Sequence, residues 1–298
     1  MAQSQQGPVV VVGDALIDEI HDDDGSSRDY VGGAALNVAV GLARLGIRTQ
    51  LIAMIGDDAD GVTIRSFLDE HDVQLIPTIG PFGSSRGVSS RVNGEPVYVF
   101  NLAAQNRRVA IDAAQAAALG DAALVVVSCF PFDDVEQTDA LLAAIPDPSK
   151  RLVVDPNPRD SMMRDRERFV ATFEAMAPKA LLIKVGDDDA KLLYGTGLDS
   201  LARMLLDAGT PNVLATAGSQ GASVSTGSGI AVTKPIVSLP GPIIDTMGAG
   251  DATLASIVAT MMQNGTPTTE GDWDEALTVA MRIAAATCRH EGALLQLP

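Results

Sequence analysis

A short glycine-rich turn near the end of the chain carries the residues best placed to do chemistry. The stretch Ile243–Ser256 reads IIDTMGAGDATLAS, so two glycines and an alanine precede Asp251, and an apolar run with helical spacing follows. A turn of small residues that leads into a helix leaves backbone N–H groups free at the positive end of the helix, which is a ready anion site. Asp251 could cap that helix, or it could act as a general base beside the anion. The turn alone leaves both interpretations open.

If the anion is a phosphoryl group, the roles in this turn can be stated. The amides of Gly248, Ala249 and Gly250 would hold the phosphoryl oxygens while Asp251 takes a proton from an attacking hydroxyl. The turn is not a dinucleotide-binding fingerprint, because Thr253 stands at the third glycine position, and the chain has no GxxxxGK[ST] loop.

Composition narrows the classes of partner. The chain has 298 residues and a formal net charge of −17, which argues against nucleic acid or an anionic membrane as the main partner. Its two cysteines, Cys129 and Cys288, lie in apolar stretches and suggest neither a disulfide framework nor a metal cluster. No stretch reaches the roughly 18–20 apolar residues of a membrane span, and the start MAQSQQGP lacks the segments of a signal peptide. We therefore expect a cytoplasmic protein.

Short apolar runs alternate with helical patterns along the chain. The predicted strands, which read as buried on both faces, are Val9–Val12, Gln50–Ile55, Leu124–Val127, Leu152–Val154, Ala180–Lys184 and Asn212–Thr216. The predicted helices are Asn37–Leu45, Gly61–His71, Asp134–Ala144, Arg164–Met176, Asp187–Tyr194, Ser200–Ala208, Ala252–Met262 and Trp273–Cys288. This alternation predicts an α/β fold, with a central, mostly parallel sheet and helices on both faces.

Two segments interrupt the alternation. Asp18–Tyr30 carries a polar turn, Asp24-Gly25-Ser26-Ser27, and Gly87–Phe100 has Asn93-Gly94 between alternating residues, which is a strong hairpin signal. Neither segment fits a doubly wound layer. We expect them to form one small β-sheet lid, built from about residues 18–31 and 86–104, over the ligand edge of a single domain spanning 1–298.

Two long motifs, more than two hundred residues apart, resemble one family. Asp245–Asp251 (DTMGAGD) resembles the DTxGAGD signature of the PfkB (ribokinase-like) carbohydrate kinases, and Gly32–Ala39 (GGAALNVA) resembles that family's GGxxxNxA element. Matching pieces between them include GDALID, IGDDADG, DPNPR and TAGSQGA, so the resemblance covers nearly the whole chain. It implies a ribokinase-like fold and transfer of the γ-phosphate of ATP to a primary hydroxyl of a sugar. The fructokinase-type members are the most similar.

The resemblance also implies residues that bind the sugar. Gly32 and Gly33 would let the backbone approach the substrate, and Asn37 would bind its hydroxyls. GDALID places Asp18 at the end of the first strand, where the family's aspartate chelates two sugar hydroxyls; Asp14, one turn earlier, is the weaker candidate. As alternatives to these roles, the glycines could form a plain turn and Asn37 could be a buried residue at a helix start.

Two other places bear on the choice of sugar. Ribokinases carry a sugar-binding glutamate where this chain has Cys129, which makes ribose less favoured. Arg159 stands where hexose and ketoacid-sugar kinases of the family use an arginine near the sugar or phosphate. Arg107 and Arg108 are read as surface charges, with sugar contacts as a hypothesis.

The resemblance also implies residues that bind ATP. Thr216, Gly218 and Gly221 match the family's ATP loop, although a plain strand exit would look similar. Gly248 and Gly250 would contribute amides, and Lys184 could supply charge to the phosphates.

Metal sites are the least specific part of the pattern. Asp189 keeps a carboxylate where many relatives have the glutamate of an Asn-x-x-Glu turn linked to Mg²⁺, but Gly186 replaces the asparagine. The run Asp187–Asp189 could instead be a solvated helix start. Backbone carbonyls near Asp245 and Gly292 would line a site for a monovalent cation such as K⁺.

Rival functions share much of this pattern. A nucleoside kinase would differ only under the lid, where Tyr30, Tyr98 and Phe100 are the aromatic candidates. A ribokinase remains an alternative, while a silent sugar sensor and an NAD-dependent oxidoreductase are disfavoured. Members of the family that the chain resembles often dimerise through the lid sheet, because an exposed strand edge invites pairing; the sequence itself leaves the oligomeric state open.

Overall fold

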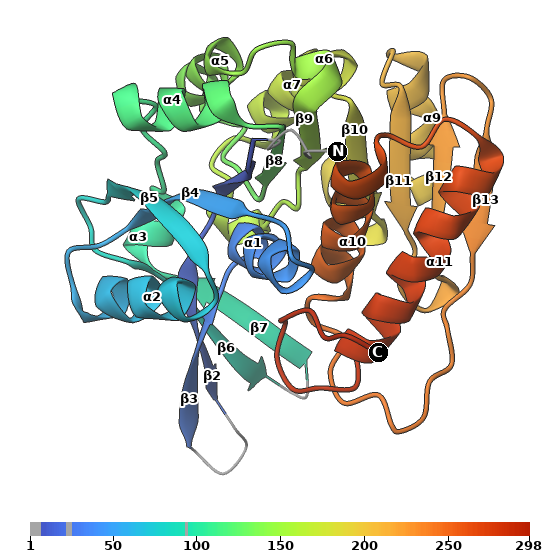
Figure 1. Ribbon diagram of the computed structural model, residues 1–298. Helices are drawn as coiled ribbons and strands as arrows, with labels where there is room; N and C mark the ends of the chain where they lie inside the picture. The colour runs from blue at the N-terminus through green and yellow to red at the C-terminus, as the bar shows by residue number, and fades with distance from the viewer. Residues whose placement is uncertain (1–6, 22–25, 93–94) are drawn as a thin grey trace, which may run out of the picture.

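The computed structural model describes residues 7–21, 26–92 and 95–298, which form two β-sheets with helices around the larger one (Figure 1). Within these residues the large sheet has nine strands in the order β13-β12-β11-β10-β9-β8-β1-β4-β5. The strands from β11 to β5 are parallel, and β12 and β13 are antiparallel. Their bounds are β1 Val9–Gly13, β4 Thr49–Ile55, β5 Val73–Ile79, β8 Leu124–Ser128, β9 Leu152–Asp155, β10 Leu182–Gly186, β11 Asn212–Thr216, β12 Ala222–Thr226 and β13 Ala231–Lys234. The predicted α/β fold is confirmed.

The central strands are apolar because the sheet buries them on both faces. All residues of β1 and β8 are buried; Val9 and Val11 face one core, while Val10 and Val12 face the other. Successive side chains of a strand point to opposite faces, so such a strand needs a helix layer on each side. The six predicted strands are all present.

Two helix layers supply that cover (Figure 1). One core is closed by α1 Ala34–Arg44, α2 Ala59–Glu70, α10 Ala249–Asn264 and α11 Glu270–Thr287. The other is closed by α4 Ala113–Asp121, α5 Val135–Ala144, α7 Arg166–Met176 and α9 Leu198–Asp207. Shorter pieces are α3 Leu102–Gln105, α6 Pro148–Arg151 and α8 Asp187–Asp189, which continues as a π-helix over Ala190–Tyr194. All eight predicted helices are present, whereas α3, α4 and α6 were not predicted.

Three strands of the large sheet, β5, β12 and β13, were not predicted from the sequence. β5 lies at one edge of the sheet and contains Pro77, and β12 and β13 form the antiparallel opposite edge. Edge strands tolerate proline and are covered less completely, so their apolar signal is weaker.

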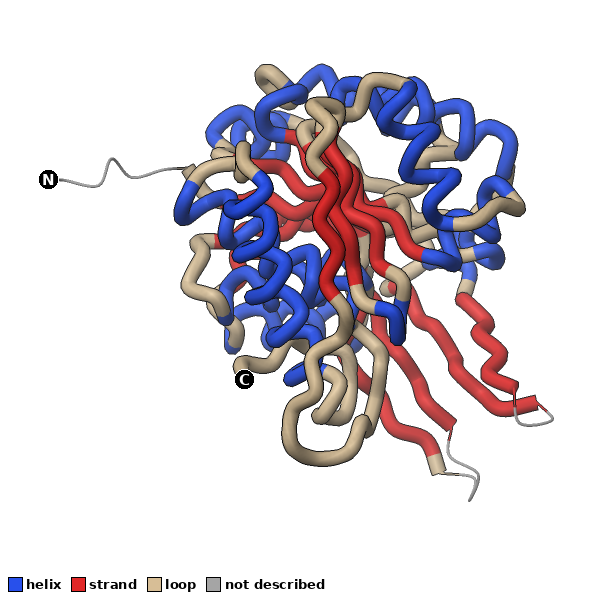
Figure 2. The backbone as a smooth tube through the Cα atoms, turned by 90° about the vertical axis from the view of Figure 1, so that its right-hand side faces the viewer, coloured by secondary structure: helices blue, strands red, loops and turns tan. Residues whose placement is uncertain are grey.

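The small sheet has the order β3-β2-β6-β7, formed by β2 Leu16–His21, β3 Ser27–Gly32, β6 Ser85–Val92 and β7 Glu95–Phe100. Figure 2 shows it projecting away from the large sheet. β2 pairs with β3 and β6 with β7 in antiparallel hairpins, and β2 runs parallel to β6. The predicted smaller sheet is confirmed, although the predicted turn residues Asp24-Gly25 and Asn93-Gly94 lie outside the described residues.

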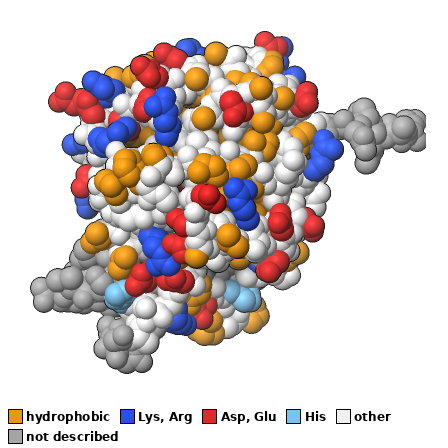
Figure 3. Space-filling view, turned by 90° about the vertical axis from the view of Figure 1, so that its left-hand side faces the viewer, with side chains coloured by type: hydrophobic (Ala, Val, Ile, Leu, Met, Phe, Trp, Pro, Cys, Tyr) orange, Lys and Arg blue, Asp and Glu red, His pale blue; other side chains and the backbone are white. Residues whose placement is uncertain are grey.

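The surface shows no concentration of positive charge on the face in Figure 3, where Lys and Arg side chains are interspersed with Asp and Glu. Among the described helices, none combines the length and the apolar character that crossing a bilayer requires.

Candidate active site

The turn before α10 has the geometry of an anion site. Gly248 precedes the helix with φ of 74°, and a Cβ there would lie 1.9 Å from the Ala293 carbonyl oxygen, so only glycine fits. The Ala249 amide makes a long 3.4 Å contact with the Thr246 carbonyl oxygen. No described protein atom accepts a hydrogen bond from the amides of Gly248, Gly250 or Asp251. These N–H groups therefore remain available to a ligand at the positive end of the helix.

Asp251 lies in the first turn of α10 with 9% of its surface exposed. Its Oδ2 accepts a hydrogen bond from Nδ2 of Asn37, on α1, at 2.9 Å, and not from an amide of its own helix. The capping interpretation is therefore not supported. Burial raises the pKa of Asp251 to about 6, against the opposing effect of the Lys184 ammonium. A carboxyl group with that pKa is ionised at neutral pH yet basic enough to accept a proton.

A buried ion pair lies beneath the same turn. Lys184, on β10, donates from Nζ to Oδ1 of Asp155 at 3.1 Å; Lys184 is 6% exposed and Asp155 is fully buried. A Cβ on Gly250 would lie 3.5 Å from this Nζ, so the ammonium adjoins the anion site from below. Burial lowers the pKa of Lys184, but the carboxylates of Asp155, Asp189 and Asp251 more than offset burial and raise it. Lys184 is therefore a fixed positive charge behind the turn.

The sugar-side aspartates lie on different elements from those expected. Asp18 was expected at the end of the first strand, and this is wrong: β1 ends at Gly13, and Asp18 is on β2 of the small sheet. Asp14 follows β1 and turns the chain toward α1, because its Oδ1 accepts from the Ala35 amide at 2.9 Å and its carbonyl from the Leu36 amide at 3.2 Å. Asp14 thereby supplies the N-terminal cap that α1 does not have itself.

Gly32 and Gly33 lie between these two aspartates. A Cβ on Gly32 would lie 2.5 Å from Oδ2 of Asp18, and one on Gly33, whose φ is 112°, would lie 2.9 Å from the Asp14 carbonyl oxygen. Burial raises the pKa of Asp18 to about 6, and the charge of Asp14 adds to that effect; burial likewise raises the pKa of Asp14. The first sequence motif thus packs against both carboxylates.

One cleft of about 800 Å³ brings together seven of the predicted residues. Its lining includes Asp14, Asp18, Gly33, Asn37, Arg159, Gly248 and Asp251. It also includes Leu16, Ala34, Phe100, Pro158, Asp160, Ser161, Met162, Asp188, Lys191, Leu192, Met247 and Ala293. The anion site and the Asp251 carboxylate therefore open into the same space as the predicted sugar-binding residues.

Arg159 and Lys191 are the positively charged side chains among the described residues that line the cleft. Burial lowers the pKa of Arg159, but nearby groups, led by Cys129 and Asp251, offset this and raise it. Arg107 was expected at the surface, and this is wrong: it is 8% exposed, and its Nη1 donates to the Met162 carbonyl at 3.1 Å. Arg108 is exposed, and neither of these two lines the cleft. Cys129 is buried and free, and burial raises its pKa to about 12.

The predicted ATP-loop residues lie next to this cleft rather than in its lining. Thr216 ends β11 and pairs with Gly186 at the end of β10. Gly218 begins the turn that follows, and Gly221 ends it. All of these positions are at the carboxyl edge of the parallel strands, where ligands of open α/β sheets bind.

The predicted metal residues are already engaged with the backbone. Asp189 is 5% exposed, and its Oδ2 accepts from the Gly186 amide at 2.6 Å; Asp187 and Asp188 are exposed. Among described residues, no group of three His, Cys, Asp or Glu side chains could hold a metal. Mg²⁺ commonly takes one or two carboxylates and completes its shell with phosphates and water. The free oxygen of Asp189 fits that requirement only if a nucleotide supplies the remaining ligands.

Asp245 and Gly292, near which the predicted monovalent-cation site would lie, are side by side. The Asp245 carboxylate accepts from the amides of Met247 at 2.9 Å and Gly292 at 3.2 Å. This contact joins the anion-site turn to the chain end that follows α11.

Sequence reasoning missed several members of the site. Asp155 belongs to DPNPR at the carboxyl end of β9, which is where a functional carboxylate is expected, so its position was a usable signal. Asp160, Ser161 and Lys191 line the cleft through irregular segments, for which the sequence has no comparable signal.

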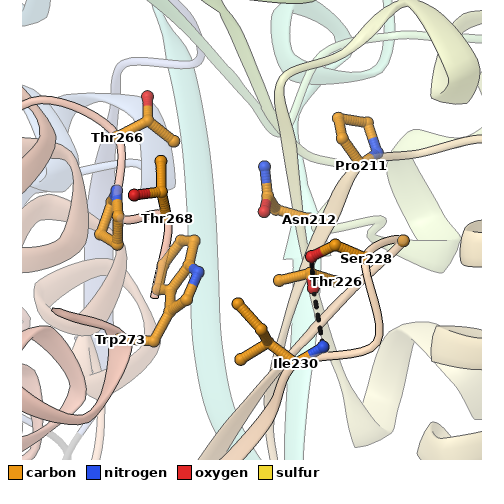
Figure 4. A pocket seen from close by; sticks show the side chains of 10 residues that line it. Pro211, Asn212, Thr226, Ser228, Ile230, Thr266, Thr268 and Trp273 are labelled. Atoms are coloured by element: carbon orange, nitrogen blue, oxygen red, sulfur yellow. Dashed lines mark hydrogen bonds between the residues drawn. The ribbon is translucent and has the colours of Figure 1, made fainter. Parts of the chain in front are cut away.

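A second cavity of about 310 Å³ lies elsewhere, between β11, β12 and the start of α11 (Figure 4). It is lined by Pro211, Asn212, Thr226, Gly227, Ser228, Ile230, Thr266, Pro267, Thr268 and Trp273. Asn212 begins β11, whereas Thr216 at the other end of that strand adjoins the cleft, so this cavity is at the opposite edge of the sheet. It contains no charged side chain and none of the predicted site residues. The cleft is the candidate active site because the predicted residues line it.

The raised pKa values predict how stability depends on pH. Asp18 and Asp251 titrate near 6 in the folded protein instead of the usual 3.8, so below about pH 6 the folded state binds more protons than the unfolded state. The free energy of unfolding should therefore rise as the pH falls from about 7.5 to about 5. Thermal unfolding followed by Trp273 emission measures this. Asp251→Asn should flatten the dependence, and a melting temperature that falls toward pH 5 would contradict the burial argument.

The sequence is similar to proteins of one family. The profile of the pfkB family carbohydrate kinases matches residues 7–298. A fructokinase from Rhizobium leguminosarum bv. trifolii is 32% identical over 266 residues, which cover 85% of this chain and 79% of that protein.

Solved structures share the fold at lower identity. A Vibrio cholerae O395 fructokinase with fructose, ADP and calcium ion bound has a TM-score of 0.80 and 21% identity, covering 97% of this chain and 95% of that one. Aminoimidazole riboside kinase from Salmonella enterica, complexed with aminoimidazole riboside and an ATP analog, has a TM-score of 0.77 and 22% identity, covering 96% and 95%. The predicted ribokinase-like fold is confirmed.

Proposed function

The chain belongs to the pfkB family of carbohydrate kinases, and from this membership and the cleft we propose that it transfers the γ-phosphate of ATP to a primary hydroxyl of fructose or a related ketose or hexose. The observation that carries the proposal is the buried Asp251 carboxylate beside backbone amides without protein partners, in one cleft with Asp14, Asp18 and Asn37.

In the proposed reaction, the sugar hydroxyl gives its proton to Asp251. Asn37 holds one oxygen of that carboxylate, which leaves the other to face the hydroxyl. The amides of Gly248 and Gly250 would stabilise the transferring phosphoryl group, with the Lys184 charge behind them. Phosphoryl transfer depends mainly on positioning and electrostatics. A general base, backbone donors and a fixed positive charge are the types of group that this reaction needs. Asp189 would help hold Mg²⁺, which neutralises phosphate charge when the nucleotide is bound.

The charge of the cleft favours an uncharged acceptor. Its lining includes five aspartates against Arg159 and Lys191, so a sugar that already carried a phosphate would meet net repulsion. Carboxylates such as Asp14 and Asp18 instead accept hydrogen bonds from vicinal hydroxyls. A neutral polyhydroxylated substrate is therefore the best fit.

A nucleoside kinase is the second candidate, favoured by the fold shared with aminoimidazole riboside kinase. Against it, Phe100 is the one aromatic side chain among the described lining residues, and Tyr30 lies beyond the lining on β3; the side chain of Tyr98 lies outside the described part of the chain. The described lining thus offers one ring, which is little surface on which to sandwich a base.

Turnover on a panel of acceptors tests the proposal. ADP release with Mg²⁺-ATP should depend on added sugar, and kcat/KM should be higher for fructose than for ribose, glucose or adenosine. Parallel assays with and without K⁺ test whether the Asp245–Gly292 region holds a monovalent cation. Highest kcat/KM on adenosine would favour the nucleoside kinase. ADP release that no acceptor stimulates would overturn the proposal.

A homodimer through the lid stays a prediction. In the described part of the chain, β3 and β7 end the small sheet with unpaired edges, which could pair between two copies. The mass in solution at micromolar concentration measures this.

A further inference from the structure

One long loop leads into the anion-site turn without regular structure of its own. Residues 235–248 connect β13 to α10, and they run below the sheet as the orange loop of Figure 1. Three of its apolar side chains, Ile236, Ile243 and Ile244, are 51%, 61% and 59% exposed, so little apolar packing holds them. Such a loop keeps one conformation only where hydrogen bonds to other parts of the chain hold it.

Residues at the end of α11 and just after it make those hydrogen bonds. Apart from the long contact between the Ala249 amide and the Thr246 carbonyl, every hydrogen bond between residues 235–247 and the rest of the described chain involves Cys288, Arg289 or Gly292. The Cys288 carbonyl accepts from the Ile244 amide at 2.9 Å and the Asp245 amide at 3.3 Å. These two bonds fix the last part of the loop, next to the Gly248 turn.

Arg289 holds the middle of the loop with its guanidinium group. Nε donates to the carbonyls of Pro240 at 2.9 Å and Leu239 at 3.2 Å, and Nη2 donates to Leu239 at 2.5 Å. Nη1 donates to the Ala285 carbonyl at 2.6 Å, in the last turn of α11. One planar group thus joins two consecutive loop carbonyls to a helix end that needs a donor.

The loop borders the nucleotide side of the site. At its start, the Lys234 carbonyl and Pro235 lie against Gly221, within 2.0 and 2.8 Å of where a Cβ would be. The sugar cleft is lined by Met247 and Gly248 but by no residue from 235 to 246. A change in the shape of the loop should therefore affect the nucleotide and leave the sugar contacts in place.

We propose that Arg289 is a positioning residue for ATP: it holds the 235–248 loop in the shape that receives the nucleotide, without touching the reacting atoms. This inference rests on the proposed ATP-dependent reaction. Without the guanidinium group the loop would have to be ordered on binding, and that entropy loss would weaken affinity.

The test compares Arg289→Met, which keeps the apolar stem, with Arg289→Lys, which keeps the charge but not the fork of donors. Arg282→Met is the matched control, because Arg282 is exposed on the same helix and has no partner among the described residues. Both Arg289 variants should raise the KM for ATP, and the Kd for ADP by calorimetry, about tenfold. The KM for fructose and the kcat at saturating ATP should stay within about twofold.

Hydrogen exchange gives a readout that does not need turnover. Amides of residues 236–245 should exchange about tenfold faster in Arg289→Met than in the wild type, and at the wild-type rate in Arg282→Met. Unchanged loop exchange, or faster exchange with an unchanged KM for ATP, would overturn the inference. An equal loss in every kinetic parameter would show a merely structural role and would overturn it too. A wild-type protein that neither binds ADP nor uses ATP would contradict the proposed function. That outcome is distinguishable from failure of the Arg289 inference, which only the comparison of the variants with an active wild type can show.

Discussion

Replacing Asp251 with asparagine lowers kcat by about 10²–10⁴-fold while the fold stays intact. The amide has nearly the shape of the carboxylate, so the packing should be retained. Burial raises the pKa of Asp251 because it disfavours the charged carboxylate, so removing that charge should not destabilise the fold. What it lacks is a site that can accept the sugar proton. The measurement is kcat at saturating fructose and ATP, with the circular dichroism spectrum and melting temperature of the same preparation.

Asp187→Asn is the matched control for this result. It makes the same chemical change at an exposed aspartate near the site that does not line the cleft, and kcat should stay within about twofold. If Asp251→Asn keeps more than about a tenth of the wild-type kcat, Asp251 is not the general base. The proton would then have to leave by another route, for example to solvent.

The fold could be predicted from the sequence where burial is complete. Val9–Val12 and Leu124–Val127 have no polar position, because helices cover both faces of the central strands. β5 was not found because Pro77 interrupts its pattern, which an edge strand tolerates. In β12 only alternate residues are buried, so its five residues offer a weak signal.

The candidate site could be predicted where one motif contains both the turn and its ligand group. Gly248 and Asp251 are neighbours in sequence, and the contact of Asn37 with Asp251 joins the two motifs. The break between β1 and β2 could not be predicted, because Ala15-Leu16-Ile17 continues the apolar run that starts at Val9. In the structure the run breaks at Asp14, whose carboxylate and carbonyl bind the amides at the start of α1. That partner lies some twenty residues away, and no local pattern reveals it.

Replacing Asp155 with asparagine should lower the free energy of unfolding by about 3–5 kcal/mol. The change leaves the Lys184 ammonium buried without its 3.1 Å partner, and an uncompensated buried charge is among the most destabilising single changes. Urea unfolding followed by the emission of Trp273, the only tryptophan and a fully buried one, measures the loss.

Two variants show whether burial of the Lys184–Asp155 pair is the cause. Asp147→Asn breaks an exposed pair with Lys150, whose side chains are 72% and 77% exposed, and should change stability by less than about 1 kcal/mol. The double variant Asp155→Asn with Lys184→Met removes both charges and should recover part of the loss, because no buried ammonium then remains unpaired. An Asp155→Asn protein as stable as the wild type would mean that water or a neighbouring carboxylate, such as Asp189 or Asp251, already balances Lys184. The ammonium would then be held by the groups of the anion site and not by β9.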